Sequence, residues 1–141
     1  MSMVHDNIIK SYSVDFEAEA LTLKTLYQTD KIFEKTNIVF TGYLVHDFEH
    51  AMKGSIINDI FECPPNMFLE RESDLLRKNK SFGWPIFYKN ENELVNFLQD
   101  HGYKIFEVFS SLGLSGFILA KHMEINHHGL QPGQSHEHAW E

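Results

Sequence analysis

The most constraining feature of this chain is a stretch between Asn37 and Phe61 in which alternate residues form two distinct faces. Successive side chains of a strand point to opposite faces, so this pattern, rich in β-branched and aromatic residues, predicts β-structure. One face of segment 38–48 carries Ile38, Phe40, Leu44, His46 and Phe48. Gly42 interrupts the pattern and indicates a bulge or a close approach of two backbones. Because the connection is short, we expect segments 38–48 and 55–62 to be antiparallel neighbours.

Shorter segments complete the predicted sheet. Alternation is present in 11–16, 20–27, 103–109 and 117–121. The last two flank a glycine-bearing turn and predict a hairpin. Segment 84–88 contains Pro85, which cannot donate a hydrogen bond to a neighbouring strand, so we expect it to be an edge strand.

Two helices are predicted in the second half of the chain. Asn66 follows two prolines and is a suitable N-cap for a helix that extends to about Lys78. A second helix, 91–101, has Asn90 as its cap and Gly102 as its C-terminal stop. The sequence therefore predicts one α+β domain, residues 1–122, with a mainly antiparallel sheet of about six strands and these two helices inserted in its second half.

The composition changes after residue 122. Residues 123–141 are rich in glycine, glutamine and histidine and poor in apolar residues, so we expect a flexible C-terminal tail. Histidine-rich segments bind divalent metal ions, and the candidate ligands here are His127, His128, His136 and His138.

Charge and cysteine content narrow the function classes. The chain of 141 residues has 20 acidic and 12 basic residues, a net charge of −8. Such a charge repels phosphate backbones, so we expect no nucleic-acid partner. The single cysteine, Cys63, precludes an internal disulfide and fits a reducing compartment. The first residues lack the apolar core of a signal peptide and no segment is long enough to span a membrane, so we expect a cytoplasmic protein without a membrane partner.

The sharpest catalytic string is His46-Asp47-Phe48-Glu49-His50, which has the H-x-x-E-H spacing of one class of zinc peptidases. That chemistry requires a helix, which brings the two histidines onto one ion. In a strand the same histidines lie about 13 Å apart and cannot share a metal. We therefore interpret the string as a strand end and predict no catalytic residues.

Carboxylates offer a different candidate site. Asp47, Glu49, Asp59 and Glu62 converge if segments 38–48 and 55–62 are paired. A group of carboxylates can bind a cation, shift a pKa or meet a basic protein surface, although most such charges only keep a sheet face hydrated. Trp84 is a further candidate, as an aromatic platform for a ligand.

The leading hypothesis is a small, acidic, non-enzymatic binding protein without a cofactor. Its partner would be a basic protein, as for immunity proteins that neutralise toxins or for a regulatory protein, an analogy of size and charge. The alternatives are a metal-dependent enzyme or metal-binding protein that uses the histidines, and a small-molecule-binding domain at Trp84. The oligomeric state stays open.

Overall fold

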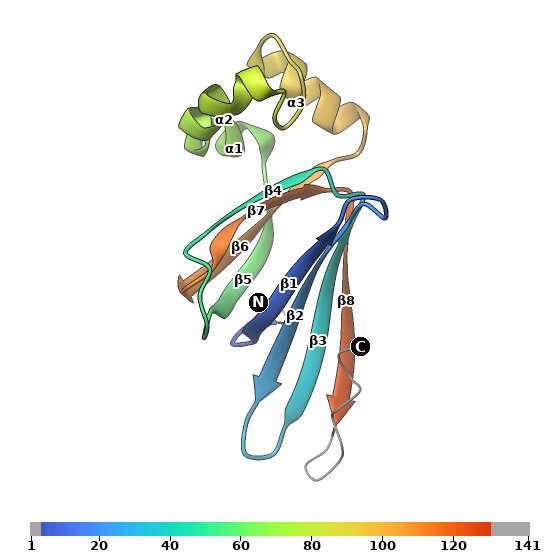
Figure 1. The fold of residues 1–141 in the computed structure, drawn as a ribbon, viewed down its shortest axis with the longest axis vertical. Coiled ribbons are helices and arrows are strands. Elements are labelled where there is room, and N and C mark those ends of the chain that lie inside the picture. The colour runs from blue at the N-terminus through green and yellow to red at the C-terminus, as the bar shows by residue number, and fades with distance from the viewer. Residues whose placement is uncertain (1–3, 131–141) are drawn as a thin grey trace.

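Within residues 4–130, which the computed structural model describes, the chain forms eight strands and three α-helices (Figure 1). The strands are β1 (Ile8–Asp15), β2 (Ala20–Gln28), β3 (Phe33–Thr41), β4 (Val45–Glu49), β5 (Ile56–Cys63), β6 (Lys104–Leu112), β7 (Ser115–Ala120) and β8 (His122–Leu130). The helices are α1 (Pro65–Arg71), α2 (Ser73–Asn79) and α3 (Glu91–Asp100), with a 3-10 turn, η1 (Lys80–Phe82), after α2. All strands belong to one antiparallel sheet in the order β4-β7-β6-β5-β1-β2-β3-β8.

The prediction of a sheet of about six strands with two helices was therefore wrong, although the fold is still broadly α+β. Two features account for the additional strands. The expected strand 38–48 is divided at Gly42, which has a φ of 65° and ends β3 before β4 begins. The segment expected to begin a tail at residue 123 instead contributes residues 123–130 to β8, which pairs with β3 along its whole length.

The sheet bends sharply where β3 passes into β4 and where β7 passes into β8. The Lys121 amide donates to the Thr41 carbonyl at 2.9 Å, and the Leu44 amide donates to the Leu119 carbonyl at 2.8 Å. These hydrogen bonds keep the two bent strands paired through the corner. A Cβ atom on Gly42 would lie 2.7 Å from Lys121 Cγ, so only glycine permits this close approach.

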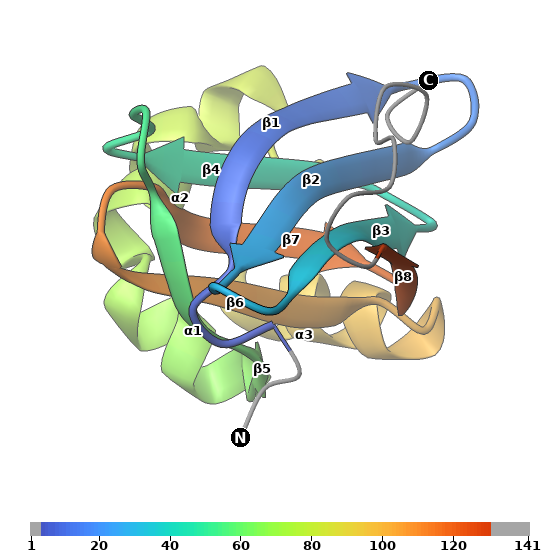
Figure 2. The same ribbon diagram turned by 90° about the horizontal axis from the view of Figure 1, so that it is seen from below.

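The bend folds the sheet over itself. Seen from below, β1 and β2 cross in front of β4 and β7, with the helices behind (Figure 2). The inner faces of the two halves enclose the main core, which includes Leu23, Ile38 and Phe40 from one half and Phe106 and Ile118 from the other. The Phe40 and Phe106 ring centroids lie 5.4 Å apart. The apolar face predicted for Phe40 is thus a real core face.

The helices cover part of the outer face of the β4-β7-β6-β5 half (Figure 1). Phe68 of α1, Leu76 of α2 and Leu94 of α3 pack against Phe117 and Leu119 of β7. This second core lies on the opposite side of the half-sheet from the main core, because the side chains of β7 alternate between its two faces.

The predicted helix 91–101 is confirmed as α3, with the Glu93 amide donating to Asn90 Oδ1 at 2.9 Å. The predicted helix from Asn66 to about Lys78 is instead two short helices that meet at Glu72. Residues 84–88 form no strand. Trp84, Ile86 and Tyr88 pack against the second core, so their alternation reflects a buried connection rather than a sheet edge.

The expected pairing of segments 38–48 and 55–62 is also wrong. β4 lies at one end of the sheet and pairs with β7, whereas β5 pairs with β6 and meets β1 at Ile8 opposite Ile56. The chain inserts β7 and β6 between β4 and β5. Period-two patterning shows which residues share a face, but it carries no information on which strands become neighbours.

Candidate functional site

The outer face of the β4-β7-β6-β5 half is apolar beneath the helices and more polar where the helices do not cover it. Cross-strand pairing places Asp47 opposite Phe117, Phe61 opposite Glu107, Glu49 opposite Ser115 and Asp59 opposite Phe109. Phe117 is buried beneath the helices, whereas Phe61 is 39% exposed and Phe109 is 53% exposed. The uncovered part of this face therefore combines carboxylates with solvent-exposed aromatic rings.

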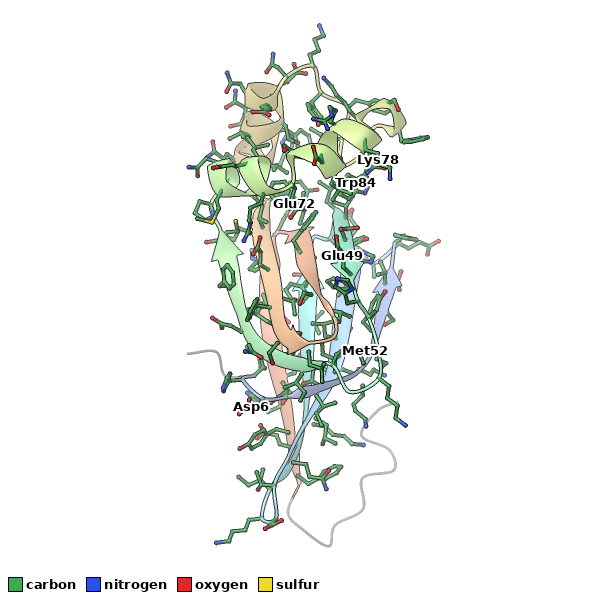
Figure 3. The ribbon with its side chains drawn as sticks, turned by 90° about the vertical axis from the view of Figure 1, so that its left-hand side faces the viewer. Asp6, Glu49, Met52, Glu72, Lys78 and Trp84 are labelled. Carbon is green, nitrogen blue, oxygen red and sulfur yellow. The ribbon has the colours of Figure 1, made fainter. Side chains whose placement is uncertain are left out.

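The charges of three carboxylates, Asp47, Glu49 and Glu72, act on one another. Figure 3 shows Glu49 on β4 below Glu72, which lies at the junction of α1 and α2. Partial burial raises the pKa of Glu72, and the charges of Asp47 and Glu49 raise that pKa further, while Arg71 opposes the change. These three carboxylates therefore repel one another in the folded protein.

The pKa of Asp47 responds to the same surroundings. Partial burial raises the pKa of Asp47, Glu49 adds to the increase, and His46 acts in the opposite direction. Perturbed carboxylates of this kind are enriched at functional sites, because selection for stability alone would remove the repulsion.

Arg71 and Glu107 form an ion pair at the margin of this group. The Glu107 side chain is 12% exposed, and Arg71 Nη2 also lies 3.4 Å from the buried Cys63 Sγ. Glu107 is thus neutralised within the fold, in contrast to the crowded carboxylates beside it. We define the acidic–aromatic face as the set Asp47, Glu49, Asp59, Phe61, Glu72 and Phe109.

Three of the predicted binding residues, Asp47, Glu49 and Asp59, share the outer face. Glu62 does not, because it lies opposite the core residue Phe106 and therefore points to the other side of the sheet. Its carboxylate is 3.9 Å from Lys104 Nζ.

Trp84 is half-buried, with its ring centroid 6.3 Å from that of Phe117. The tryptophan joins the helical layer to the sheet, so its position is that of a packing residue rather than of an open platform. Its place beside the helices is visible in Figure 3.

Glu72, Phe61 and Phe109 were missed in the sequence. A signal was available for the two phenylalanines, because each alternates with a residue of the inner core, Ile60 or Val108, and must therefore point outward. No local pattern identifies Glu72, since it approaches Asp47 only through the docking of the helices on the sheet.

The H-x-x-E-H string lies in β4 and the turn that follows, not on a helix. His46 faces inward, where its Nδ1 is 2.7 Å from the Tyr43 hydroxyl and its ring centroid is 4.9 Å from that of Phe48. Burial lowers the pKa of His46, and the charge of Asp47 opposes that change. His50 has a φ of 58° and lies beyond the strand.

Among the four histidines considered as metal ligands, His127 and His128 belong to β8, while His136 and His138 lie outside the described residues. His127 Nδ1 is 3.0 Å from Thr36 Oγ1 and 3.3 Å from Glu34 Oε1. In the described range 4–130, no group of three or more His, Cys, Asp or Glu side chains is arranged to hold a metal ion.

Comparison with known proteins does not assign a function to this chain, so the geometry of the site is the basis for the proposal. No family model matches the chain, and no curated protein or solved structure is significantly similar to it. Among the described residues, no helix has the length and apolar character needed to cross a membrane.

Proposed function

We propose that this chain is a non-enzymatic binding protein whose acidic–aromatic face engages a basic segment of another protein. The observation that carries the proposal is the group Asp47, Glu49 and Glu72, in which partial burial and mutual repulsion together raise the pKa values of Asp47 and Glu72. Lysine or arginine side chains of a partner would relieve this repulsion, and the folded protein would gain stability when they bind.

The exposed rings supply the apolar part of such an interface. Phe61 and Phe109 lie on neighbouring strands and point outward from the same side of the sheet. Aromatic residues are enriched at protein interfaces, where a few buried side chains dominate the binding energy. The net charge of −8 would also speed the approach of a basic partner. An immunity-type or a regulatory role is consistent with this mode of binding.

The test is affinity capture from an extract of the native host at low salt, followed by identification of the bound protein. We compare the wild-type chain with a face variant, Asp47→Asn/Glu49→Gln/Glu72→Gln. The matched control, Asp15→Asn/Glu17→Gln/Asp30→Asn, removes the same number of charges from exposed positions at the β1–β2 and β2–β3 turns. We expect the control to retain a basic partner and the face variant to lose it.

A second variant, Phe61→Ser/Phe109→Ser, removes the two exposed rings and keeps every carboxylate. It therefore measures the apolar contribution to binding separately from the contribution of charge. We expect it to weaken binding of the captured partner as well, because Phe109 lies opposite Asp59 and Phe61 is on the same outer face. Equal retention by all variants, equal loss in the control, or capture of no specific partner with or without crosslinking would show that the proposal is wrong.

A further inference from the structure

A second surface of the molecule has the opposite charge. Residues 75–90 contain four cations and no carboxylate, on a chain whose net charge is −8. The cations are Arg77, Lys78, Lys80 and Lys89. They lie on α2, on η1 and in the connection that leads to α3, at the helical end of the molecule (Figures 1 and 3).

The same segment exposes two large apolar side chains. Phe82 is 79% exposed and Phe87 is 84% exposed, more than the other large apolar side chains of the described residues. The orientation of Phe87 follows from its neighbours, because Ile86 and Tyr88 on either side pack against the second core. An outward position of this kind would ordinarily carry a polar residue, so the exposed rings indicate an interaction surface.

The local backbone holds the Phe87 ring in place. Gly83 has a φ of 70°, and its amide donates to the Lys80 carbonyl at 3.0 Å. A Cβ atom at Gly83 would lie 2.5 Å from Phe87 Cζ, so the ring rests directly on the glycine backbone. Lys80 Nζ donates to the Lys89 carbonyl at 2.7 Å and thereby ties the two ends of the segment together. The exposure of Phe87 is thus a property of an ordered turn.

Part of this segment borders an open hollow of about 660 Å³. Its lining includes Arg77, Lys80, Phe87, Tyr88 and Lys89. Lys80 Nζ lies 5.1 Å from the centroid of the Tyr88 ring, so positive charge and aromatic surface are interleaved. We define the basic–aromatic surface as Arg77, Lys78, Lys80, Phe82, Phe87 and Lys89.

We propose that the basic–aromatic surface binds a short acidic peptide segment of a partner protein, one that carries large apolar side chains among its carboxylates. The lysines provide the charge complement, and Phe82 and Phe87 provide apolar contact area. This surface is independent of the acidic–aromatic face, because its charge is opposite and the two sets share no residue.

The border of the surface favours a narrow ligand. Asp74 is 2.7 Å from Arg77, and Glu93 lies in the lining of the hollow. Glu91 stands beside Glu93 at the start of α3. A planar anionic membrane or a long phosphate backbone would come against these carboxylates and be repelled. A short peptide that occupies the hollow would meet three cations, Arg77, Lys80 and Lys89, against the single carboxylate of Glu93.

The experiment measures fluorescence anisotropy of a labelled synthetic peptide of alternating glutamate and leucine. A peptide of alternating lysine and leucine is the control ligand. We expect saturable binding of the acidic peptide to the wild-type chain, decreasing as salt is added. We expect Lys78→Glu/Lys89→Glu to weaken that binding by about tenfold or more. The matched control, Lys31→Glu/Lys53→Glu, changes two exposed lysines in distant turns and should leave binding unchanged.

A charge-neutral variant, Phe82→Ser/Phe87→Ser, should also weaken binding, and because both rings are exposed its thermal midpoint should equal that of the wild type. The proposal is overturned if the acidic peptide does not bind to the wild-type chain. It is also overturned if Lys78→Glu/Lys89→Glu and Lys31→Glu/Lys53→Glu weaken binding of the peptide equally. It is also overturned if phosphatidylserine vesicles or single-stranded DNA bind more tightly and depend on the same residues. Dissociation of a homo-oligomer by Lys78→Glu/Lys89→Glu would assign the surface to a second copy instead.

Discussion

The two faces of the β4-β7-β6-β5 half-sheet differ in how far their apolar character extends. The inner face is apolar along the strands, with Phe106, Val108 and Ile118 buried against the other half of the sheet. The outer face is apolar only beneath the helices, where Phe117 and Leu119 are buried. Beyond the helices it presents Asp47, Glu49 and Asp59 beside exposed rings.

This difference separates two roles within one set of strands. Burial of apolar side chains on the inner face is the main source of stability in a sheet folded over itself. The uncovered outer face includes carboxylates whose pKa values are raised, which is unfavourable for the isolated fold. Substitutions of buried apolar residues on the inner face should therefore destabilise the protein. Substitutions of the exposed rings or the crowded carboxylates on the uncovered part of the outer face should leave its stability nearly unchanged or increase it slightly.

The largest expected effect is in the main core, which the inner face forms with the other half of the sheet. Phe40→Ala should lower the free energy of unfolding by about 3–5 kcal/mol, because Phe40 is fully buried and the substitution leaves a cavity. Phe109→Ala, on the outer face, should change it by less than about 1 kcal/mol. Chemical denaturation of both variants measures the difference. Similar losses at the two positions would mean that the outer face is also a core.

The contact between β4 and β7 depends on a glycine. A Cβ atom on Gly116 would overlap the Asp47 carbonyl oxygen, so Gly116→Ala should displace β4 and lower the free energy of unfolding by about 1–3 kcal/mol. Gly102→Ala is the matched control, since nothing lies within 4 Å of a Cβ atom there. Its φ of 75° should cost about 1 kcal/mol. Thermal denaturation that ranks Gly102→Ala as the more damaging change would contradict the close approach.

Within the outer face, the two partners of one ion pair should respond unequally to substitution. Arg71→Gln leaves the Glu107 carboxylate, 12% exposed, without its cation and should cost about 1–3 kcal/mol of stability. Glu107→Gln should cost less, because Arg71 is 43% exposed and remains hydrated. Denaturant titrations of the two variants give the order, and the reverse order would mean that the arginine depends on the pair more than the carboxylate does.

The elements that the sequence predicts well are set by local chemistry. Asn90, Glu93 and Gly102 mark the ends of α3 through hydrogen bonds and backbone conformations within a few residues. The alternation around Phe40 likewise shows which side chains are buried, because a strand places every second residue on one face.

The order of the strands and the position of Glu72 could not be predicted from the sequence, because both depend on contacts between distant segments. The sheet order places β7 and β6 between β4 and β5, and no local pattern specifies that choice. For the same reason Asp47 and Glu49 were recognised as candidates, but their third neighbour, Glu72, was not. The break between α1 and α2 and the docking of both helices bring Glu72 to them.

The smallest expected effect is a gain in stability from removing charge on the acidic–aromatic face. The folded-state pKa values of Asp47 and Glu72 are raised, so the folded protein holds these protons more tightly than the unfolded chain does. The resulting destabilisation is complete above the folded pKa and disappears as the pH falls below the ordinary carboxyl pKa. Asp47→Asn and Glu72→Gln should therefore raise the denaturation midpoint slightly at pH 7.

The same reasoning predicts that this advantage decreases steadily on acidification and is absent at about pH 3, where both carboxyl groups are protonated in either state. Asp30→Asn, in the exposed β2–β3 turn, removes one charge without relieving a crowded group and should leave the midpoint unchanged at both pH values. Denaturation curves of the wild type and these variants at a series of pH values measure how the stability difference depends on pH. An advantage that grows as the pH falls would mean that the carboxylates stabilise the folded protein, and it would remove the basis for the binding of a basic partner to this face.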